Sequence, residues 1–397
     1  MQWDRASRII EVLFVGLTLL LSLRTQGTPT YQMLEVSPLW HEGNPQAGQL
    51  GLGGYLPPQI RHAYGFDRVS ASGTPAIIGV VVAYGSPTIQ KDFAMFNEYY
   101  RLSPASLQIF YPTGQPTEHR TEWSSETALD VEWAHALAPT AHLLLVVAKT
   151  QTIADLLSGV DFAVARRASV IVMSWGRPEF RGEADMDVHF SQPGTLFVAA
   201  AGDRGTQVLW PAVSSKVVAV GGTSLLLDLA GNRLSPEEAW KWSGGGISRF
   251  ISQPGYQVSA SDRTDGQRGV PDLAFFADSD IGVTVYTTSG TGRGWVRVGG
   301  TSLAAVGVAA ALSFTIGRGN EPPKEIHPKL YALASGSTYQ DYFRDVTVGS
   351  NGDCGQVCAA ARGYDLVTGL GSPRVNEIVS SLRPLSALCL NPSPCPL

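Results

Sequence analysis

Short apolar runs that alternate with helical segments are the feature that most constrains how this chain can fold. Ala76–Ala83 reads AIIGVVVA, a continuous apolar run typical of a parallel strand covered on both faces. Further strands are predicted at His142–Val147, Ser169–Met173, Thr195–Ala201 and Val217–Val220. Helices are predicted at Lys91–Tyr100, Ser124–Leu137, Thr152–Arg166 and Ser302–Phe314. This alternation predicts βαβ units and an α/β fold with a doubly wound, mostly parallel sheet flanked by helices.

The composition indicates a globular protein and argues against a nucleic-acid partner. The 397 residues are 44% hydrophobic, and 29 basic against 34 acidic residues give a net charge of −5. The basic residues form no cluster, and phosphate binding requires one. The length fits one large domain or two. We expect a leader over residues 1–27, a linker over 28–50, one folded domain over 51–385 and a Pro-rich tail over 386–397.

The leader has the pattern of an export signal. Arg5 and Arg8 precede the apolar run Val12–Leu23. This run is shorter than the roughly 20 residues that span a bilayer, but it suits the hydrophobic part of a secretory signal. The cleavage site at Thr25-Gln26-Gly27 matches the small-residue rule only loosely, so an uncleaved anchor over residues 9–23 is the alternative. We expect a secreted or extracytoplasmic protein.

Four cysteines fit an oxidising compartment. Cys354 and Cys358 are close together, as are Cys389 and Cys395. Four cysteines allow three pairings, and two local loops are the economical choice. A metal site is disfavoured because no histidine or third cysteine stands near either pair.

Two copies of the pentad GGTSL offer two candidate nucleophiles. Ser302 lies where a Gly-rich turn enters a helix of small residues, and a helix N-terminus offers free N–H groups to a developing oxyanion. Ser224 is followed by LLLDLAGN, which predicts that it ends in a sheet. We therefore prefer Ser302.

Three carboxylates accompany this serine at the edge where parallel strands end, which is where ligands bind in such sheets. Glu126 and Asp130 are four residues apart on a predicted helix, so both project from one face. A solvated acidic face is the alternative, but the helix is otherwise strongly apolar. Glu132 points elsewhere and is expected at the surface. Asp203 follows a predicted buried strand, and an ordinary turn aspartate is its alternative interpretation.

The histidines argue against a Ser-His-Asp enzyme. None of the seven is followed by glycine as in the subtilisin histidine motif, and no G-x-S-x-G elbow is present. They are His41, His62, His119, His135, His142, His189 and His327. His135 is expected to be a packed side chain.

These motifs together resemble the sedolisin (serine-carboxyl peptidase) family. The resemblance rests on GGTS at Ser302, ETALD before VEWAHALAP at Glu126 and Asp130, and AAGD at Asp203. It continues in the family's order through VIVMSWGRPEF, WPAVSSKVVAVGG, GGGISRF, RGVPDLA and YDLVTGLGSP, and spans residues 51–382. One such motif would be weak, but the ordered set is specific.

The resemblance implies a subtilisin-like fold and a peptidase that works in acid. Ser302 would be the nucleophile, Glu126 the base, Asp130 its support and Asp203 an oxyanion donor. Ser174-Trp175-Gly176 resembles the segment that lines the substrate cleft. The resemblance further implies peptide or protein substrates and a monomer.

The resemblance also implies one Ca²⁺ site near the C-terminus. The matching positions are Asp345, Val346, Ala361, Gly363 and Asp365, which would supply two carboxylates and backbone carbonyls. Such hard oxygen ligands suit Ca²⁺.

Three positions depart from the family pattern. Val306 stands where the family usually has proline, Val82 where many relatives carry an acid, and Ala361 where glycine is common. The departures at Val306 and Val82 leave a second hypothesis open, a catalytically inactive secreted relative that binds a peptide or a cell-surface partner.

Overall fold

The structure is a computed structural model that describes residues 33–42, 53–70, 75–260, 263–316 and 325–383. The predicted leader, the Pro-rich tail and the pair Cys389 and Cys395 lie outside the described residues. Cys354 and Cys358 form a disulfide, as predicted. Within the described ranges, no helix is both long and apolar enough to cross a membrane.

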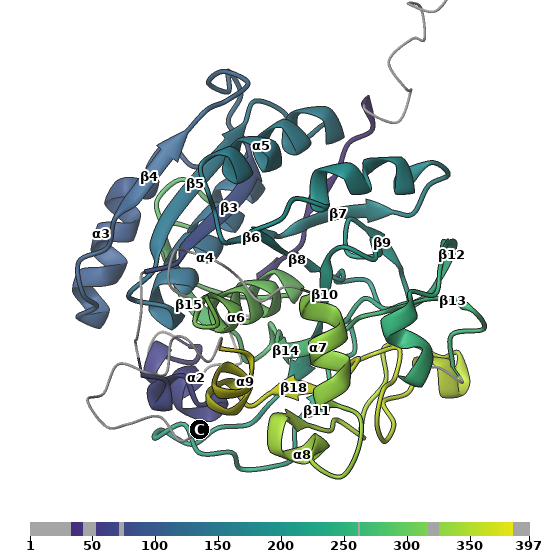
Figure 1. Cartoon of the computed structure of the whole chain (residues 1–397). Helices are drawn as coiled ribbons and strands as arrows, with labels where there is room; N and C mark the ends of the chain where they lie inside the picture. Colours follow the sequence, from purple (N-terminus) through teal and green to yellow (C-terminus); the bar gives the residue numbers. More distant parts are fainter. Residues whose placement is uncertain (1–32, 43–52, 71–74, 261–262, 317–324, 384–397) are drawn as a thin grey trace, which may run out of the picture.

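The centre of the protein is a sheet whose strands run parallel apart from one edge strand (Figure 1). Its order is β11-β10-β8-β6-β3-β5-β4, and β14 also pairs with β10. The bounds are β3 Ile77–Ala83, β4 Leu107–Phe110, β5 His142–Ala148, β6 Val170–Met173, β8 Leu196–Ala200, β10 Val218–Ser224, β11 Glu238–Ala239 and β14 Leu273–Phe276. Only β11 pairs antiparallel within this sheet. The predicted α/β fold with a mostly parallel sheet is therefore confirmed.

Smaller sheets surround this centre, and two of them contain residues from the N-terminal part of the chain. One has the order β1-β7-β9 and another β15-β16-β2. Their strands are β1 Ser37–Pro38, β2 His41–Glu42, β7 Trp175–Pro178, β9 Leu209–Trp210, β15 Val283–Thr287 and β16 Gly294–Gly299. Two further pairs join β12 Gly246–Ser252 to β13 Gln267–Val270 and β17 Phe343–Arg344 to β18 Ser372–Pro373. The linker predicted over residues 28–50 thus contains two paired strands in its described part.

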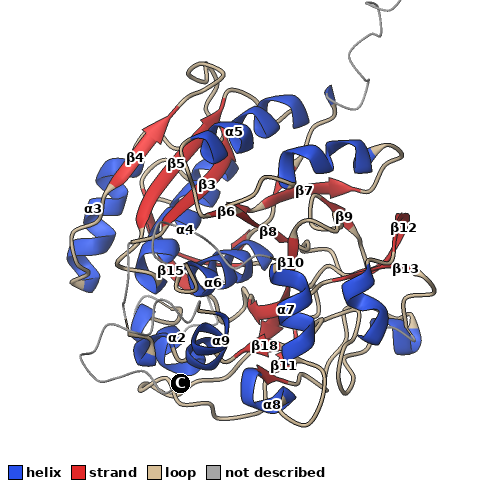
Figure 2. Cartoon of the chain, viewed as in Figure 1, coloured by secondary structure: helices blue, strands red, loops and turns tan. Residues whose placement is uncertain are grey.

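The helices flank the sheet and follow the predicted segments closely (Figure 2). They are α2 Pro57–Tyr64, α3 Ile89–Tyr100, α4 Thr121–Leu137, α5 Ile153–Ala165, α6 Thr301–Ser313, α7 Ile326–Leu333, α8 Tyr339–Tyr342 and α9 Val375–Leu382. Helices α4 and α6 pack against each other and against the sheet. This packing brings the start of α6 beside the middle of α4.

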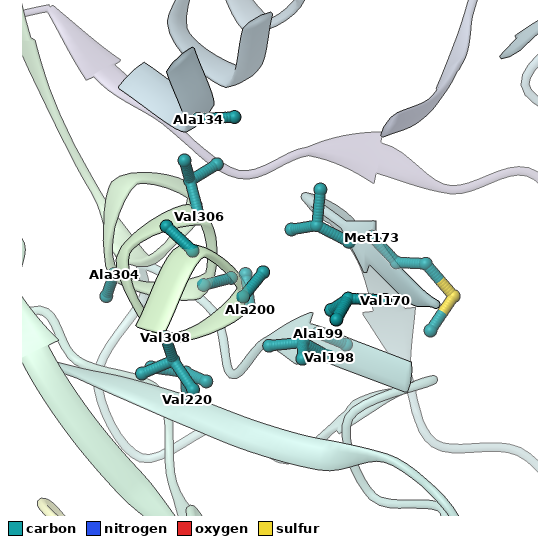
Figure 3. Close-up of a cluster of buried hydrophobic side chains, with 14 of the residues drawn as sticks. Ala134, Val170, Met173, Val198, Ala199, Ala200, Val220, Ala304, Val306 and Val308 are labelled. Carbon is teal, nitrogen blue, oxygen red and sulfur yellow. The ribbon is translucent and has the colours of Figure 1, made fainter. Parts of the chain in front are cut away.

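Helix α6 is buried along its whole length, which explains its small residues. Every residue from Thr301 to Ser313 is buried. A Cβ atom at Gly307 would lie 2.5 Å from the ring of Phe275, so only glycine allows this approach. Figure 3 shows Ala304, Val306 and Val308 of α6 among side chains of the central strands.

One glutamate of α4 was predicted wrongly. Glu132 was expected at the surface, but its side chain is fully buried and its Oε2 accepts the N–H of Tyr286 at 2.9 Å. The error has a physical reason, because α4 is covered on all sides. Its neighbours α3, α6, β3 and β15 leave no solvated face. His135 on the same helix is packed, as expected, and contacts the carbonyl of Ser103.

Candidate active site

The preferred serine lies in the first turn of α6, two residues after a glycine whose backbone conformation and close contacts exclude a side chain. Gly300 has φ +112, in the region that favours glycine. A Cβ atom there would lie 2.5 Å from Oδ2 of Asp203 and 3.0 Å from the carbonyl oxygen of Leu39. The close approach therefore places Ser302 beside both an acid and a peptide carbonyl.

Ser302 is hydrogen-bonded to a carboxyl group of α4. Its Oγ donates to Oε2 of Glu126 at 3.1 Å, and both side chains are fully buried. Asp130 lies one turn further along α4, where its Oδ1 accepts the hydroxyl of Ser174 at 2.7 Å. The structure thus brings together Ser302, Glu126, Asp130 and the predicted cleft residue Ser174.

Burial dominates the electrostatics of the two α4 acids. Desolvation and then the charge of Asp130 raise the pKa of Glu126 well above its usual value. Desolvation also raises the pKa of Asp130, opposed first by the hydrogen bond from Ser174 and then by the interaction with Glu126. Oε1 of Glu126 and Oδ2 of Asp130 are buried without a hydrogen-bond partner among the described residues. Because two buried carboxylates repel each other, the pair should bind a first proton more tightly than free acids would.

The third predicted acid, Asp203, lies on the loop after β8, close to the start of α6. Asp203 follows β8, and its Oδ1 accepts the N–H and the hydroxyl of Thr301 at 2.8 and 2.7 Å. Its Oδ2 has no hydrogen-bond partner among the described residues, although Nε2 of His41 lies 3.8 Å away. Burial raises the pKa of Asp203, opposed by the charge of His41 and the bonds from Thr301. A protonated Oδ2 would be free to donate.

Thr301 is a site residue that the sequence reasoning missed. Its hydroxyl donates to Asp203 and accepts the N–H of Gly202 at 3.0 Å, so it ties the β8 loop to α6. The signal was present, because Thr301 is the third residue of the GGTS motif. Only the folded contact reveals that it orients the acid.

A second group of missed residues belongs to the chain's own N-terminal part. The N–H of Leu39 donates to Oε2 of Glu126 at 3.0 Å and to the carbonyl of Ser174 at 3.1 Å. The carbonyl oxygen of Leu39 accepts the N–H of Ser302 at 3.1 Å and also the Ser302 hydroxyl. Trp40 donates its indole N–H to the carbonyl of Glu122 at 3.0 Å. A cavity of about 250 Å³ lies alongside this segment and beside Asp203.

The second GGTSL pentad lies apart from this cluster. Ser224 is the last residue of β10, as predicted, and its hydroxyl donates to Asp278 at 2.5 Å. Its contacts do not include the carboxyls of α4. The structure therefore supports the choice of Ser302 over Ser224 as the residue beside the acids.

The predicted calcium ligands come from two segments, residues 345–346 and 361–365, which a hydrogen bond joins. The N–H of Gly363 donates to Asp345 at 3.1 Å, and the N–H of Ala361 donates to Asp365 at 2.9 Å. Val346 is buried next to Asp345. Among the described residues, the donors that reach the two carboxylates are all uncharged: they are backbone N–H groups, Thr368 and Tyr339. Neutral donors do not compensate the negative charge of this pair.

No larger acidic or histidine cluster is present in the described ranges. There, no three His, Cys, Asp or Glu side chains come together as metal ligands. The loop of residues 361–365 offers only two carboxylates, so a cation would depend on backbone carbonyls for its remaining ligands. That donor set is one that Ca²⁺ accepts.

Two of the three departures from the expected pattern, Val82 and Val306, are packing positions. Val82 is buried in β3, and Val306 is buried in α6 and points toward α4 near Ala134 in Figure 3. Neither is among the polar contacts of the serine and the carboxyls. The bond from Ser174 to Asp130 holds the pair without an acid at position 82.

Comparisons with known proteins agree with this geometry. The sequence profile of the Subtilase family matches residues 116–327. Kumamolisin from Bacillus sp. (strain MN-32) is 30% identical over 365 residues, which cover 83% of this chain and 64% of kumamolisin. Sedolisin from Pseudomonas sp. (strain 101) is 31% identical over 217 residues, which cover 48% of this chain and 35% of sedolisin. This chain therefore spans less than two thirds of the length of these relatives.

A solved structure shows the same relationship in three dimensions. Pseudomonas sedolisin, a serine-carboxyl proteinase complexed with two molecules of pseudo-iodotyrostatin, superposes with a TM-score of 0.70 and 26% identity. The match covers 82% of this chain and 97% of that one. On these grounds, the chain belongs to the subtilase family and, within it, to the sedolisin group with the subtilisin-like fold.

Proposed function

We propose that the chain is a serine-type peptidase in which a carboxyl group takes the place of histidine. The observation that carries the proposal is the bond from Oγ of Ser302 to Oε2 of Glu126 at 3.1 Å, in a pocket closed to solvent. A serine is a weak nucleophile unless an adjacent base accepts its proton. Kumamolisin and sedolisin, named above, support the peptidase assignment by similarity.

Each residue of the cluster has a separate role in the proposed reaction. Ser302 attacks the substrate carbonyl and passes its proton to Glu126, which returns it to the leaving amine. Asp130 accepts the hydroxyl of Ser174 and holds Glu126 in place. The N–H of Ser302 and a protonated Oδ2 of Asp203 stabilise the oxyanion. Water then hydrolyses the acyl-enzyme, with Glu126 taking and returning a second proton.

Acid pH is the condition under which these roles are compatible. Asp203 can donate only while it holds a proton, and burial raises its pKa. Glu126 must be free to accept a proton from the serine. We therefore propose a bell-shaped pH profile with its maximum below neutral.

We also propose one Ca²⁺ site, held by the carboxylates of Asp345 and Asp365 with the carbonyls of Val346, Ala361 and Gly363. The ion would compensate the charge of the two carboxylates and fasten the 361–365 loop to residues 345–346. The N–H groups of Ala361 and Gly363, two residues apart, donate to Asp365 and Asp345 respectively, which supports a site shared by the two carboxylates.

Export from the cytoplasm is part of the proposal. The bond between Cys354 and Cys358 supports it, because such bonds persist mainly in oxidising compartments. Substrates would be peptides or unfolded proteins, cut by a monomer.

The nucleophile test uses the duplicated pentad as its control. Ser302→Ala should abolish hydrolysis of an unfolded protein substrate, while Ser224→Ala should retain most of it. A fluorophosphonate serine probe should label the wild type and the Ser224 variant only. Folded wild type that never reacts with the probe would favour the inactive, peptide-binding alternative.

A further inference from the structure

The loop that carries Asp203, residues 202–207, is bound along its backbone to a second segment, residues 242–245. Three hydrogen bonds join them: the N–H of Gly244 donates to the carbonyl of Gly202 at 2.5 Å, the N–H of Gly205 to that of Trp242 at 3.0 Å, and the N–H of Gly245 to that of Gln207 at 3.2 Å. These bonds lie on both sides of Asp203 in the sequence. The position of the 242–245 segment therefore helps to set the position of the acid.

The two segments approach so closely that a displacement of one must displace the other. A Cβ atom at Gly244 would lie 2.1 Å from the carbonyl oxygen of Ala201, so only a residue without a side chain fits there. Gly205 has φ +70, and a Cβ atom on it would lie 2.5 Å from the carbonyl oxygen of Asn351. Close-packed interiors transmit such displacements, because they contain little free volume. Asn351 thus lies directly against the Asp203 loop.

Asn351 also binds the second segment through its side chain. This side chain belongs to a residue that is only 4% exposed, and its Nδ2 donates to the carbonyl of Ser243 at 2.9 Å. A carbonyl oxygen can only accept, so the amide nitrogen must face Ser243. Ser243 lies between Trp242 and Gly244, which both bind the Asp203 loop. Asn351 therefore contacts both the Asp203 loop and the segment that holds it.

The Cys354–Cys358 disulfide closes the loop that presents Asn351. The N–H of Asn351 donates to the carbonyl of Cys358 at 2.9 Å, next to an isolated antiparallel bridge between Ser350 and Ala359. Cys358 is buried, whereas Cys354 is exposed. The bond therefore fastens the exposed part of the loop to the buried residue that pairs with Asn351.

Packing alone does not hold this loop in place. Residues 352–357 are exposed. A cavity of about 540 Å³ is lined by Asn351, by both cysteines and by residues 178–179. Segments with few buried contacts open more easily than the core of a protein does. The hydrogen bonds of Asn351 and the disulfide therefore decide where this residue lies.

We propose that Asn351 is a positioning residue for Asp203 and that the Cys354–Cys358 bond keeps it in place. The proposal rests on the proposed function, in which the protonated Asp203 donates to the oxyanion. Asn351 bonds to Ser243 and Cys358, so it acts on the reaction only through the Asp203 loop. Loss of its side chain should lower kcat and leave KM nearly unchanged, because Asp203 acts on charge that forms in the transition state.

The first variant is Asn351→Leu, which keeps a branched side chain of similar size and removes the amide that donates to Ser243. A 1 Å misplacement can cost on the order of 10²-fold in rate, so a partial shift of the loop should lower kcat roughly 10-fold, with KM changed less than about twofold. The measurement is steady-state hydrolysis of a fluorogenic peptide at acid pH, below the Tm of each variant. Gln356→Leu, the same change at an exposed position of the same loop, is the matched control and should retain the wild-type kcat.

A double-mutant cycle with Asp203→Ala separates positioning of the acid from general support of the fold. If Asn351 acts through Asp203, Asn351→Leu should change the residual kcat of the Asp203→Ala enzyme by less than about twofold. A merely structural role would lower kcat by the same factor in both backgrounds. Equal losses in the two backgrounds, or a wild-type kcat in Asn351→Leu, would refute the positioning role.

The second variant, Cys354→Ser combined with Cys358→Ser, tests the disulfide while Asn351 and Ser243 are retained. It should lower kcat in the same way, and it should have no further effect on kcat in the Asn351→Leu background, although Tm should fall in both. This variant also tests the positioning if Asn351→Leu does not fold. A wild-type kcat in the double-serine variant would refute the role of the disulfide.

The fluorophosphonate probe distinguishes failure of this proposal from failure of the proposed function. If wild type hydrolyses the peptide and reacts with the probe while both variants keep its kcat, the positioning proposal is refuted and the peptidase function stands. If wild type neither hydrolyses the peptide nor reacts with the probe, both are refuted.

Discussion

Asp203 offers one carboxyl oxygen to Thr301 and keeps the other free. Oδ1 accepts the N–H and the hydroxyl of Thr301 at 2.8 and 2.7 Å, while Oδ2 has no hydrogen-bond partner in the part of the chain that the structure describes. This arrangement fixes the orientation of the carboxyl group. It also directs the free oxygen toward the space that Gly300 leaves open beside the Leu39 carbonyl.

Thr301 should therefore act as a positioning residue. Thr301→Val removes the hydroxyl that donates to Asp203 and leaves the N–H of Gly202 without its partner. Asp203 is neutral in the reacting state, and a hydrogen bond between neutral groups contributes about 0.5–1.5 kcal/mol, so kcat/KM at the pH optimum should fall by roughly 2- to 10-fold. The bonds from Thr301 lower the pKa of Asp203, so the alkaline limb of the pH profile should move upward.

Thr301→Ser is the control for that change, since it keeps the hydroxyl. It should restore both the rate and the position of the alkaline limb. A valine variant with lower activity but an unshifted pH profile would mean that Thr301 supports only the packing of α6.

The pH dependence of the wild type should depend on Asp203. An ordinary aspartate has a pKa of about 3.9, and burial raises that of Asp203. Activity should peak below neutral and fall as Asp203 loses its proton. Asp203→Asn keeps a donor that cannot ionise, so its residual activity should lose the alkaline decline. Asp203→Ala should cost on the order of 10²–10³ in rate.

The measurement is kcat/KM across pH for the three proteins. A Ser-His-Asp mechanism would give a different pH profile. A wild-type optimum near neutral or above, abolished by replacing a histidine, would return the protein to the ordinary Ser-His-Asp class.

Calcium should stabilise the fold through Asp345 and Asp365. A ligand that binds only the folded state adds about 2.7 kcal/mol at 100 times its Kd, so excess chelator should lower Tm. Asp345→Asn should reduce this chelator effect. Asp341→Asn, at an exposed aspartate of α8, is the matched control and should retain it. An unchanged Tm in a sample shown beforehand to contain the metal would argue against the site.

Glu132 should make the protein more stable in acid than at neutral pH. Burial raises the pKa of Glu132 well above its usual value, opposed by the bond from Tyr286 and assisted by Asp92. Between the unfolded and the folded pKa, the folded state binds more protons than the unfolded state. The free energy of unfolding therefore falls as pH rises through that window.

Glu132→Gln cannot ionise, so it should weaken the dependence of Tm on pH. Melting curves at about pH 5 and about pH 7.5 would measure the difference. Glu126 and Glu183, whose pKa values burial also raises, should preserve part of the slope. Glu98→Gln, at an exposed glutamate of α3, should leave the slope unchanged. A glutamine variant with the full wild-type slope would refute the assignment to Glu132.

Much of the fold follows from local pattern. The runs at Ala76–Ala83 and His142–Val147 became β3 and β5 because a strand buried on both faces needs a continuous apolar sequence. The i, i+4 spacing placed Glu126 and Asp130 on one side of α4 for an equally local reason. The small-residue run after Ser302 likewise marked a helix that packs closely.

Other features depended on which segments meet in space. Glu132 shares the sequence context of Glu126, and only the packing of β15 over α4 shows that it is buried. The segment around Leu39 looked like a linker, because a polar sequence with proline and glycine has no periodicity of its own.

The sequence by itself thus determined the strand and helix pattern, the candidate nucleophile and the candidate acids, because propensity, periodicity and motif spacing act along the chain. The tertiary structure decided that Thr301 orients Asp203 and that Leu39 lies against Ser302. The physical reason is the separation along the chain. Thr301 and Asp203 are 98 positions apart, and Ser302 and Leu39 are 263 positions apart. Hydrogen bonds over such separations leave no local pattern in a single sequence.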